Sequence, residues 1–157
     1  ETQASQFVGA VYKNAVVLAK DAREASDIFY KKGQGDVLLN YENEVILAAK
    51  QGRTSSAYTV PSVNISIDTP VAVIDKNVDK NGTRKVAEAF VKFLFTPAAQ
   101  REFAKTGFRP VNSTVAAEFK FPAIAKLYTI GNLGGWDGAD AKFFADGAIF
   151  DRIYAGR

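Results

Sequence analysis

The sequence of 157 residues contains no cysteine, no histidine and no methionine. Without cysteine and histidine the chain lacks thiol and imidazole nucleophiles, the usual general base, and the standard ligands of zinc and haem. We therefore expect no metal site, no cofactor and no enzymatic activity that depends on these groups. The absence of cysteine also removes disulfides as a guide to the compartment in which the protein works.

Long apolar runs and charge clusters are absent as well. No run approaches the roughly 20 apolar residues that a membrane-spanning helix needs. The 20 basic and 17 acidic residues are spread along the chain and leave a net charge of +3, so we expect no nucleic-acid surface. The chain begins at Glu1 instead of methionine, which predicts a longer natural protein that was processed, cleaved or truncated.

Apolar spacing and capping signals predict a series of helices along the chain. Helices are expected at Ser5–Lys13, Ala22–Lys32, Glu42–Lys50, Thr83–Phe95, Pro97–Lys105 and Thr114–Phe119, with a final helix from Gly134. Asp21 is the expected N-cap of the second helix, Glu24 completes a capping box, and Gly33 ends the helix. The helix from Thr83 carries an apolar stripe that is typical of a face turned toward a core.

Short apolar runs between these helices predict strands, and the alternation of helices and strands indicates an α/β protein. The expected strands are Val16–Leu18, Asp36–Tyr41, Ala57–Val60, Val63–Ile67, Pro70–Asp75 and Leu127–Ile130. Trp136 follows a glycine pair, and we expect its ring to pack against the sheet. A hydrophobic fraction of 47% is enough for one ordinary core.

The segment Asp36–Glu44 gives the clearest indication of a binding site. Its apolar centre is typical of a parallel strand that is buried on both faces. Ligands of open α/β sheets lie beyond the carboxyl ends of the strands, so Tyr41 is expected to face a ligand. Glu42 and Glu44 could form a carboxylate pair for hydrolysis. Residues at i and i+2 do not share a helix face, however, which favours a capping or junction role.

The order of motifs along nearly the whole chain resembles the periplasmic sulfate-binding proteins that deliver sulfate to an ABC transporter. The motifs are Phe7–Asn14 (FVGAVYKN), Ala22-Arg23, Gly33–Leu39 (GQGDVLL), Tyr41–Glu44 (YENE), Pro61-Ser62, Pro70–Lys76 (PVAVIDK), Gly107–Pro110 (GFRP), Gly134–Trp136 (GGW) and Phe144–Gly147 (FADG). Any one of them alone would be weak, and their common order makes the resemblance specific.

The resemblance implies an α/β fold of the periplasmic-binding-protein type (type II), of which this chain is the C-terminal half. It assigns residues 1–68 to the second lobe, residues 69–108 to a crossover and a segment of the first lobe, and residues 109–157 to a return to the second lobe. In such proteins the dianion lies between two lobes and is held by neutral donors, including peptide N–H groups at helix N-termini.

Individual roles also follow from the resemblance. Ala22 matches the residue whose peptide N–H donates to sulfate, and Arg23 matches an arginine that braces this peptide unit. Tyr41 stands where the family has a tryptophan that donates its indole N–H, and a phenol can donate one hydrogen bond instead. Glu24 stands where a glycine is common. The opposing donors of the site belong to the half that this chain does not contain.

The resemblance thus implies a periplasmic, non-enzymatic protein that binds sulfate for import through ABC transporter membrane subunits. A thiosulfate or other oxyanion-binding protein is the alternative in the same class, and a hydrolase that uses Glu42 and Glu44 is the alternative from another class. A half-protein would expose core surface, so a homodimer of this chain is also expected.

Overall fold

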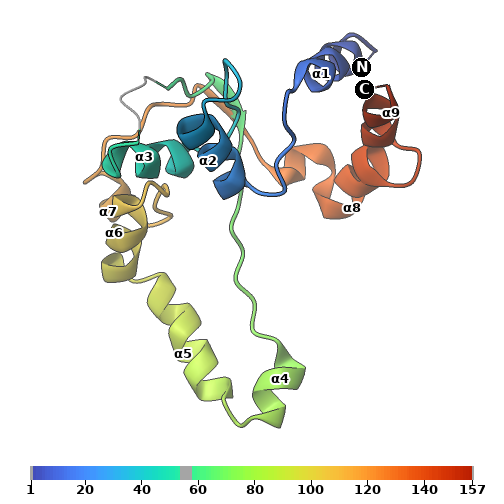
Figure 1. Ribbon diagram of the computed structural model, residues 1–157. Helices are drawn as coiled ribbons and strands as arrows, with labels where there is room; N and C mark the ends of the chain where they lie inside the picture. The colour runs from blue at the N-terminus through green and yellow to red at the C-terminus, as the bar shows by residue number, and fades with distance from the viewer. Residues whose placement is uncertain (1, 54–57, 157) are drawn as a thin grey trace. The chain divides into compact units, whose positions relative to one another are not determined.

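A computed structural model describes residues 2–53 and 58–156, which divide into two compact units (Figure 1). The first unit comprises Glu1–Asn40, Thr59–Ile67 and Ile124–Arg157, and the second comprises Tyr41–Tyr58 and Asp68–Ala123. Each unit is therefore assembled from segments that are distant in the sequence. The assignment of three consecutive stretches to two lobes remains a prediction.

The first unit combines helices with a small parallel sheet. It contains α1 (Thr2–Asn14), α2 (Ala22–Lys32), β1 (Val63–Ile65), β2 (Lys126–Tyr128), the 3-10 helix η1 (Ile130–Leu133), α8 (Gly135–Ala139), the π-helix η2 (Asp140–Phe144) and α9 (Ile149–Ala155). Strand β1 pairs in parallel with β2, and Asn64 lies opposite Leu127. A parallel pair needs a long connection, which here contains most of the second unit.

Helices α1 and α9 lie side by side in this unit (Figure 1). The ring of Tyr12 on α1 meets the ring of Phe150 on α9 edge to face, with centroids 5.9 Å apart. Phe150 also stacks on Tyr154 at 5.7 Å. The pairing of α1 with α9 is thus an aromatic contact between opposite ends of the described sequence.

The expected single final helix is instead three separate elements, α8, η2 and α9. The interruption follows from Gly147, which has a φ of 71° in the left-handed region that favours glycine. The Gly147 N–H donates to the Asp151 carboxylate at 2.9 Å, and Arg152 donates to the Gly147 carbonyl at 3.0 Å. These bonds close a turn before α9 and prevent one continuous helix.

The described part of the second unit is helical. It contains α3 (Glu42–Lys50), α4 (Asp75–Lys80), α5 (Arg84–Leu94), α6 (Pro97–Lys105) and α7 (Ser113–Ala116). The sequence patterns missed α4 and predicted a strand at Pro70–Asp75. Arg84 explains the difference, because its guanidinium pairs with Asp75 at 2.8 Å and with Asp79 at 2.7 Å, which ties both ends of α4 to the start of α5.

Helices α6 and α7 form the best-packed part of the second unit. Val115 on α7 is fully buried, and Ala99 and Ala104 on α6 are buried as well. The buried amide of Gln100 donates to the Leu94 carbonyl and accepts from the Val111 N–H, both at 2.8 Å. The burial of Gln100 is therefore compensated by hydrogen bonds to backbone on both sides of α6.

Most of the predicted strands are wrong for the described residues, where β1 and β2 make up the sheet. Residues 16–18, 37–39 and 70–74 are not in strands, and the side chains of Val37 and Leu39 are each 78% exposed. The expected strand at Ala57–Val60 begins outside the described residues. An apolar run becomes a strand only when a neighbouring strand accepts its backbone hydrogen bonds, and the described residues provide no such neighbour for these runs.

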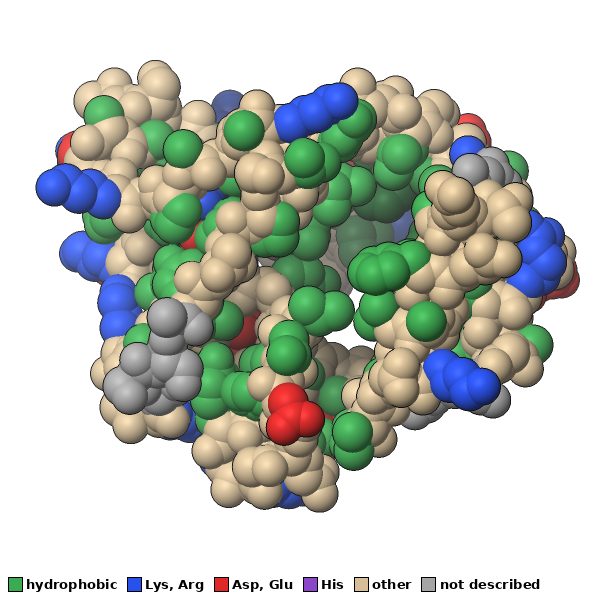
Figure 2. Space-filling model, turned by 90° about the horizontal axis from the view of Figure 1, so that it is seen from above, with side chains coloured by type: hydrophobic (Ala, Val, Ile, Leu, Met, Phe, Trp, Pro, Cys, Tyr) green, Lys and Arg blue, Asp and Glu red, His purple; other side chains and the backbone are tan. Residues whose placement is uncertain are grey.

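Large apolar side chains lie on the surface of both units, and the face drawn in Figure 2 shows many of them. Trp136 is 71% exposed, so its expected packing against the sheet is wrong. Phe90 and Phe93 on α5 are 57% and 51% exposed, although their spacing predicts a core face. Within residues 2–53 and 58–156, no helix has both the length and the apolar character required to cross a bilayer.

Candidate functional site

The N-terminus of α2 in the first unit carries Ala22 at the first helical position, as the sequence predicts. Asp21 is the N-cap and accepts a hydrogen bond from the Glu24 N–H at 2.8 Å. The first N–H groups of a helix have no acceptor within the helix, and the positive end of the helix dipole lies among them. The Ala22 N–H therefore belongs to the kind of backbone end that binds anions.

The expected capping box is present only in part. Glu24 reaches back with its carboxylate, but it accepts from the Lys20 N–H at 2.9 Å instead of from the Asp21 N–H. The chain turns tightly before α2, which brings Lys20 within reach of the helix. Asp21 and Glu24 are thus both engaged by backbone N–H groups, where carboxylates also complement the helix dipole.

Asn40 fastens the end of the Asp36–Asn40 segment to the first turn of α2. Its side-chain amide donates to the Ala22 carbonyl at 2.8 Å and to the Ser26 hydroxyl at 3.0 Å. Ser26 is buried, with 3% of its surface exposed. The sequence patterns assign no role to Asn40, because an amide in a loop gives no indication of a partner 18 residues earlier. Asn40 fixes the backbone that includes Ala22.

The N-terminus of α3 in the second unit begins directly after Tyr41. Tyr41 is the N-cap residue, has an extended backbone with φ of −70° and ψ of 145°, and provides no side-chain cap. The Tyr41 side chain is 48% exposed. Its carbonyl accepts from the Glu44 N–H at 3.1 Å, which closes the first turn of the helix.

Glu42 is held by an arginine that lies far away in the sequence. Arg109 donates from Nε to Glu42 Oε2 at 2.7 Å and from Nη2 to Glu42 Oε1 at 3.2 Å. Tyr58 approaches the same carboxylate at 3.5 Å, and burial together with the negative charge of Glu42 raises the pKa of the Tyr58 phenol. A carboxylate engaged on both oxygens is poorly placed to act as a general base.

Glu44 has a different environment from Glu42. The Glu44 side chain is buried, with 7% of its surface exposed, whereas the alternative of a hydrolytic pair would need two carboxylates open to a substrate. Within the part of the chain that the structure describes, no three acidic side chains are grouped to hold a metal ion. Glu42 is thus tied to Arg109, and Glu44 lies buried in the same turn of α3.

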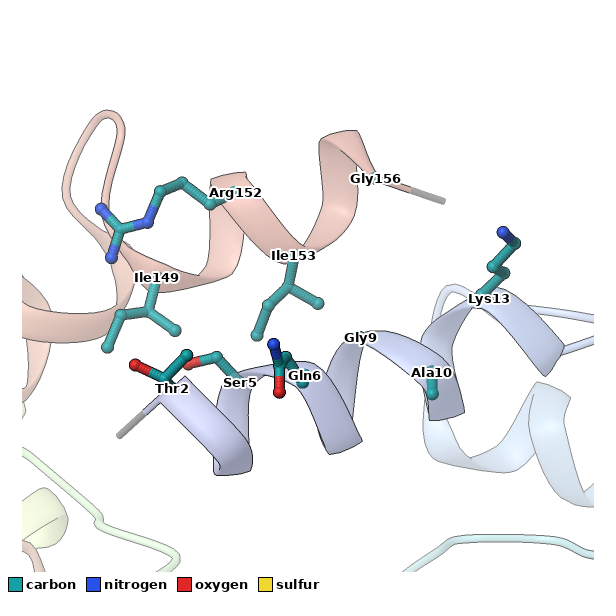
Figure 3. A pocket seen from close by; sticks show the side chains of 10 residues that line it. All are labelled: Thr2, Ser5, Gln6, Gly9, Ala10, Lys13, Ile149, Arg152, Ile153 and Gly156. Carbon is teal, nitrogen blue, oxygen red and sulfur yellow. The ribbon is translucent and has the colours of Figure 1, made fainter.

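A groove of about 600 Å³ lies between α1 and α9 in the first unit (Figure 3). Ser5, Gln6 and Lys13 line it from α1, and Ile149 and Ile153 line it from α9. None of the residues predicted to bind an anion is among those that line this groove. The groove is therefore separate from the predicted anion-binding residues and gives no support to a site at Ala22 or Tyr41.

The family model for bacterial extracellular solute-binding proteins matches residues 2–109. The chain belongs to this family. The match includes the N-terminus of α2, the N-terminus of α3, and Arg109 at its very end. The members of this family are described as extracellular proteins that bind solutes.

Individual members of the family show which solute-binding proteins this chain is similar to. The chain is 56% identical over 156 residues to the sulfate-binding protein of Synechocystis sp., with 98% of this chain and 44% of the relative covered. It is 36% identical over 158 residues to the thiosulfate-binding protein of Pseudomonas aeruginosa, with 99% of this chain and 48% of the relative covered. The chain thus spans about half the length of the relatives it matches.

A solved structure confirms the fold class that the sequence predicts. The sulfate-binding protein SubI from Mycobacterium tuberculosis matches with a TM-score of 0.73 and 38% identity over 85% of this chain and 45% of that chain. The fold is therefore α/β of the periplasmic-binding-protein type, represented here by a partial-length chain. Its parallel β1–β2 pair and flanking helices are consistent with that class.

Proposed function

We propose that the protein binds sulfate in the periplasm and delivers it to the membrane subunits of an ABC importer. The observation that carries the proposal is the 56% identity, over nearly all of this chain, to a relative that is named a sulfate-binding protein. Binding and release require no nucleophile or general base, which agrees with a sequence that has no cysteine and no histidine. The protein is proposed to act without catalysing a reaction.

The proposed donors are the Ala22 peptide N–H and the Tyr41 hydroxyl, with Arg23 as a brace for the peptide unit at Ala22. Support for Ala22 comes from its place at the first position of an eleven-residue helix whose cap is occupied by Asp21. Support for Tyr41 comes from its position as the exposed N-cap residue of α3. Neutral donors suit a dianion because an uncharged group needs no counter-ion of its own when the anion is absent.

Selectivity follows from the same donors. Sulfate is fully deprotonated at neutral pH and can accept at every oxygen, whereas phosphate retains a proton whose O–H would remain unpaired among donors. An unpaired polar group in a closed site costs about 1–3 kcal/mol, so phosphate should bind about five- to a hundredfold more weakly. Thiosulfate keeps the tetrahedral shape and the charge, and it remains the alternative ligand because one relative is named for it.

Isothermal titration calorimetry of the complete protein that contains this chain tests the proposal. We expect sulfate to bind more tightly than thiosulfate, and phosphate to bind far more weakly than either. If thiosulfate binds more tightly than sulfate, thiosulfate is the ligand and the proposal for sulfate is wrong. Absence of binding for both anions would contradict the proposed function.

The 157-residue chain alone is proposed to bind sulfate weakly and to self-associate. Half of a site competes with water for each hydrogen bond, and its charges are screened. The exposed apolar face of α5, with Val86 at 72% and Phe90 at 57%, favours association between copies. Light scattering that reports a monomer over a wide range of concentrations would contradict the proposed homodimer.

A further inference from the structure

The loop after α6 holds the first turn of α3 through Arg109. Besides its two bonds to Glu42, the guanidinium donates from Nη2 to the Pro122 carbonyl at 2.8 Å. Its central carbon also lies 5.2 Å from the centre of the Phe121 ring. Arg109 thus has a fixed position between the chain that follows α7 and the first residue of α3. A planar guanidinium can make these contacts together, which an ammonium group cannot do.

Gly107 brings the backbone of the same loop against α3. A Cβ atom at Gly107 would lie 2.9 Å from the Asn43 Cα and 3.1 Å from the Ile46 Cβ, so only glycine permits this approach. At the other end of the helix, the Lys50 ammonium donates to the Lys105 carbonyl. Helix α3 is therefore held along its length by α6 and by the loop that follows α6.

The start of α3 depends on these contacts because no local cap defines it. The Tyr41 side chain makes no capping hydrogen bond, in contrast to Asp21 on α2, Thr96 on α6 and Asn112 on α7. Tyr41 is joined by one peptide bond to Glu42, whose side chain is 17% exposed and paired with Arg109. The backbone of Tyr41 is thus joined directly to residues that the loop after α6 holds in place.

We propose that Arg109 is a positioning residue for ligand binding, which acts by fixing the first turn of α3 and hence the direction of the Tyr41 side chain. The inference rests on the proposed role of Tyr41 as a donor to the anion. Arg109 does not touch the ligand itself in this account. Its removal leaves the Tyr41 phenol intact and lowers the fraction of molecules in which the phenol has the geometry for binding.

The pair formed by Arg101 and Glu118 is a matched control within the same unit. Arg101 donates to Glu118 at 2.7 and 2.6 Å, so its fork resembles that of Arg109. The Arg101 side chain is 44% exposed and the Arg109 side chain is 37% exposed. These two hydrogen bonds join α6 to the residues after α7, and neither of them goes to α3. Loss of the Arg101–Glu118 pair should lower the free energy of unfolding by a similar amount and leave Tyr41, and hence the affinity for sulfate, unaffected.

The first test is a double-mutant cycle on sulfate affinity in the complete protein. We expect Arg109→Gln to weaken binding by about tenfold in the wild-type background and by less than about twofold when Tyr41 is already Phe. Arg101→Gln should change affinity by less than about twofold in both backgrounds. Equal losses from Arg109→Gln in both backgrounds would overturn the proposal, since the arginine would then act independently of Tyr41.

The second test follows Tyr41 without any ligand. Incorporation of 3-fluorotyrosine labels the six tyrosines, and the fluorine signal that disappears in Tyr41→Phe belongs to residue 41. We expect Arg109→Gln to shift or broaden this signal and Arg101→Gln to leave it unchanged. Glu42→Gln keeps one acceptor oxygen and should give a smaller change in the same direction, which provides a milder variant if Arg109→Gln unfolds.

The two tests separate this inference from the proposed function. Failure of wild-type protein to bind sulfate would contradict the proposed function, while the fluorine signal would still decide whether Arg109 positions Tyr41. An unchanged Tyr41 signal in both Arg109→Gln and Glu42→Gln would overturn the inference even if sulfate binds normally.

Discussion

The N-terminal ends of α2 and α3 are constructed in different ways. The end of α2 is local, because Asp21 caps it and Glu24 accepts from Lys20 four residues before it. The end of α3 has no side-chain cap and is held by Arg109, which is 67 residues away from Glu42 in the sequence. The start of α2 is therefore capped by its own sequence, with Asn40 adding a contact from 18 residues away, whereas the start of α3 is held by tertiary contacts.

This difference predicts different responses to substitution. A change at the Asp21 cap of α2 should act through one capping bond and remain small. Changes in the loop after α6 should be larger, because Gly107 and Arg109 together determine where α3 begins and how Tyr41 is presented. Each helix end provides one of the two donors that we propose for the anion, so the comparison can be tested by stability and by binding.

The largest effect is expected for Gly107→Ala. Gly107 has a φ of 95°, and a Cβ atom would lie 2.9 Å from the Asn43 Cα. Strained backbone costs about 1–3 kcal/mol and overpacking adds about 1–3 kcal/mol, so the free energy of unfolding should fall by about 3 kcal/mol or more. Urea unfolding measures this loss.

Gly82→Ala is the matched control for Gly107→Ala. Gly82 also has a positive φ, of 64°, but a Cβ atom there would meet nothing within 4 Å. Its cost should be limited to the backbone term of about 1–2 kcal/mol. Equal losses for the two variants would show that the contact between the loop and α3 contributes nothing to stability.

The next effect concerns the phenol of Tyr41. Tyr41→Phe removes the proposed donor and keeps the ring, and the loss of a hydrogen bond to a charged acceptor costs about 1.5–3 kcal/mol, or about ten- to a hundredfold in affinity. Calorimetric titration with sulfate measures it. Tyr30→Phe is the control, because the ring of Tyr30 meets Phe29 edge to face and keeps this contact without its hydroxyl. An unchanged affinity would remove Tyr41 from the site.

The same comparison explains which parts of the structure were predictable from the sequence. Residues that act on near neighbours were predicted correctly: the cap Asp21 and the stop at Gly33, which has a φ of 63°. These signals work because the donor and the acceptor lie within one helical turn. The bounds of α2 were predicted correctly for this reason. The bounds of α3 were also predicted correctly, although Tyr41 provides no side-chain cap.

The strands and the brace on α3 were not predictable in this way. Val37 and Leu39 have the composition of a buried strand, but a strand also requires a partner, and composition does not specify one. The fork between Arg109 and Glu42 joins two segments whose proximity is determined only in the folded chain. The resemblance supplied Ala22, and the expected strand together with the resemblance supplied Tyr41, whereas Asn40 and Arg109 required the structure.

A smaller effect is expected at the cap of α2. Asp21→Ala removes the acceptor for the Glu24 N–H and should lower the free energy of unfolding by about 1 kcal/mol. Thr83→Ala is the control, because Thr83 is the N-cap residue of α5 but its side chain makes no capping bond. Thermal unfolding of both variants measures the difference. If Thr83→Ala costs as much as Asp21→Ala, the local bond at α2 is not what stabilises its start.

The smallest effect, and the most direct report on the brace at α3, is the ionisation of Tyr58. Burial and then the negative charge of Glu42 raise the pKa of the Tyr58 phenol, and the hydrogen bond to Glu42 acts in the same direction. The positive charge of Arg109 opposes this shift. A raised pKa in the folded state means that the stabilisation is present below the ordinary tyrosine pKa of about 10 and is lost as the pH rises through the folded value.

Substitution of each partner should therefore move the Tyr58 pKa in opposite directions. Glu42→Gln removes the negative charge and should lower the pKa toward its ordinary value, whereas Arg109→Gln removes the positive charge and should raise it further. The difference between the ultraviolet titrations of each protein with and without Tyr58→Phe isolates this residue from the other five tyrosines. A decrease of the pKa in Arg109→Gln would mean that the guanidinium does not lie beside the Glu42 carboxylate in solution, and the tertiary account of how α3 begins would then be wrong.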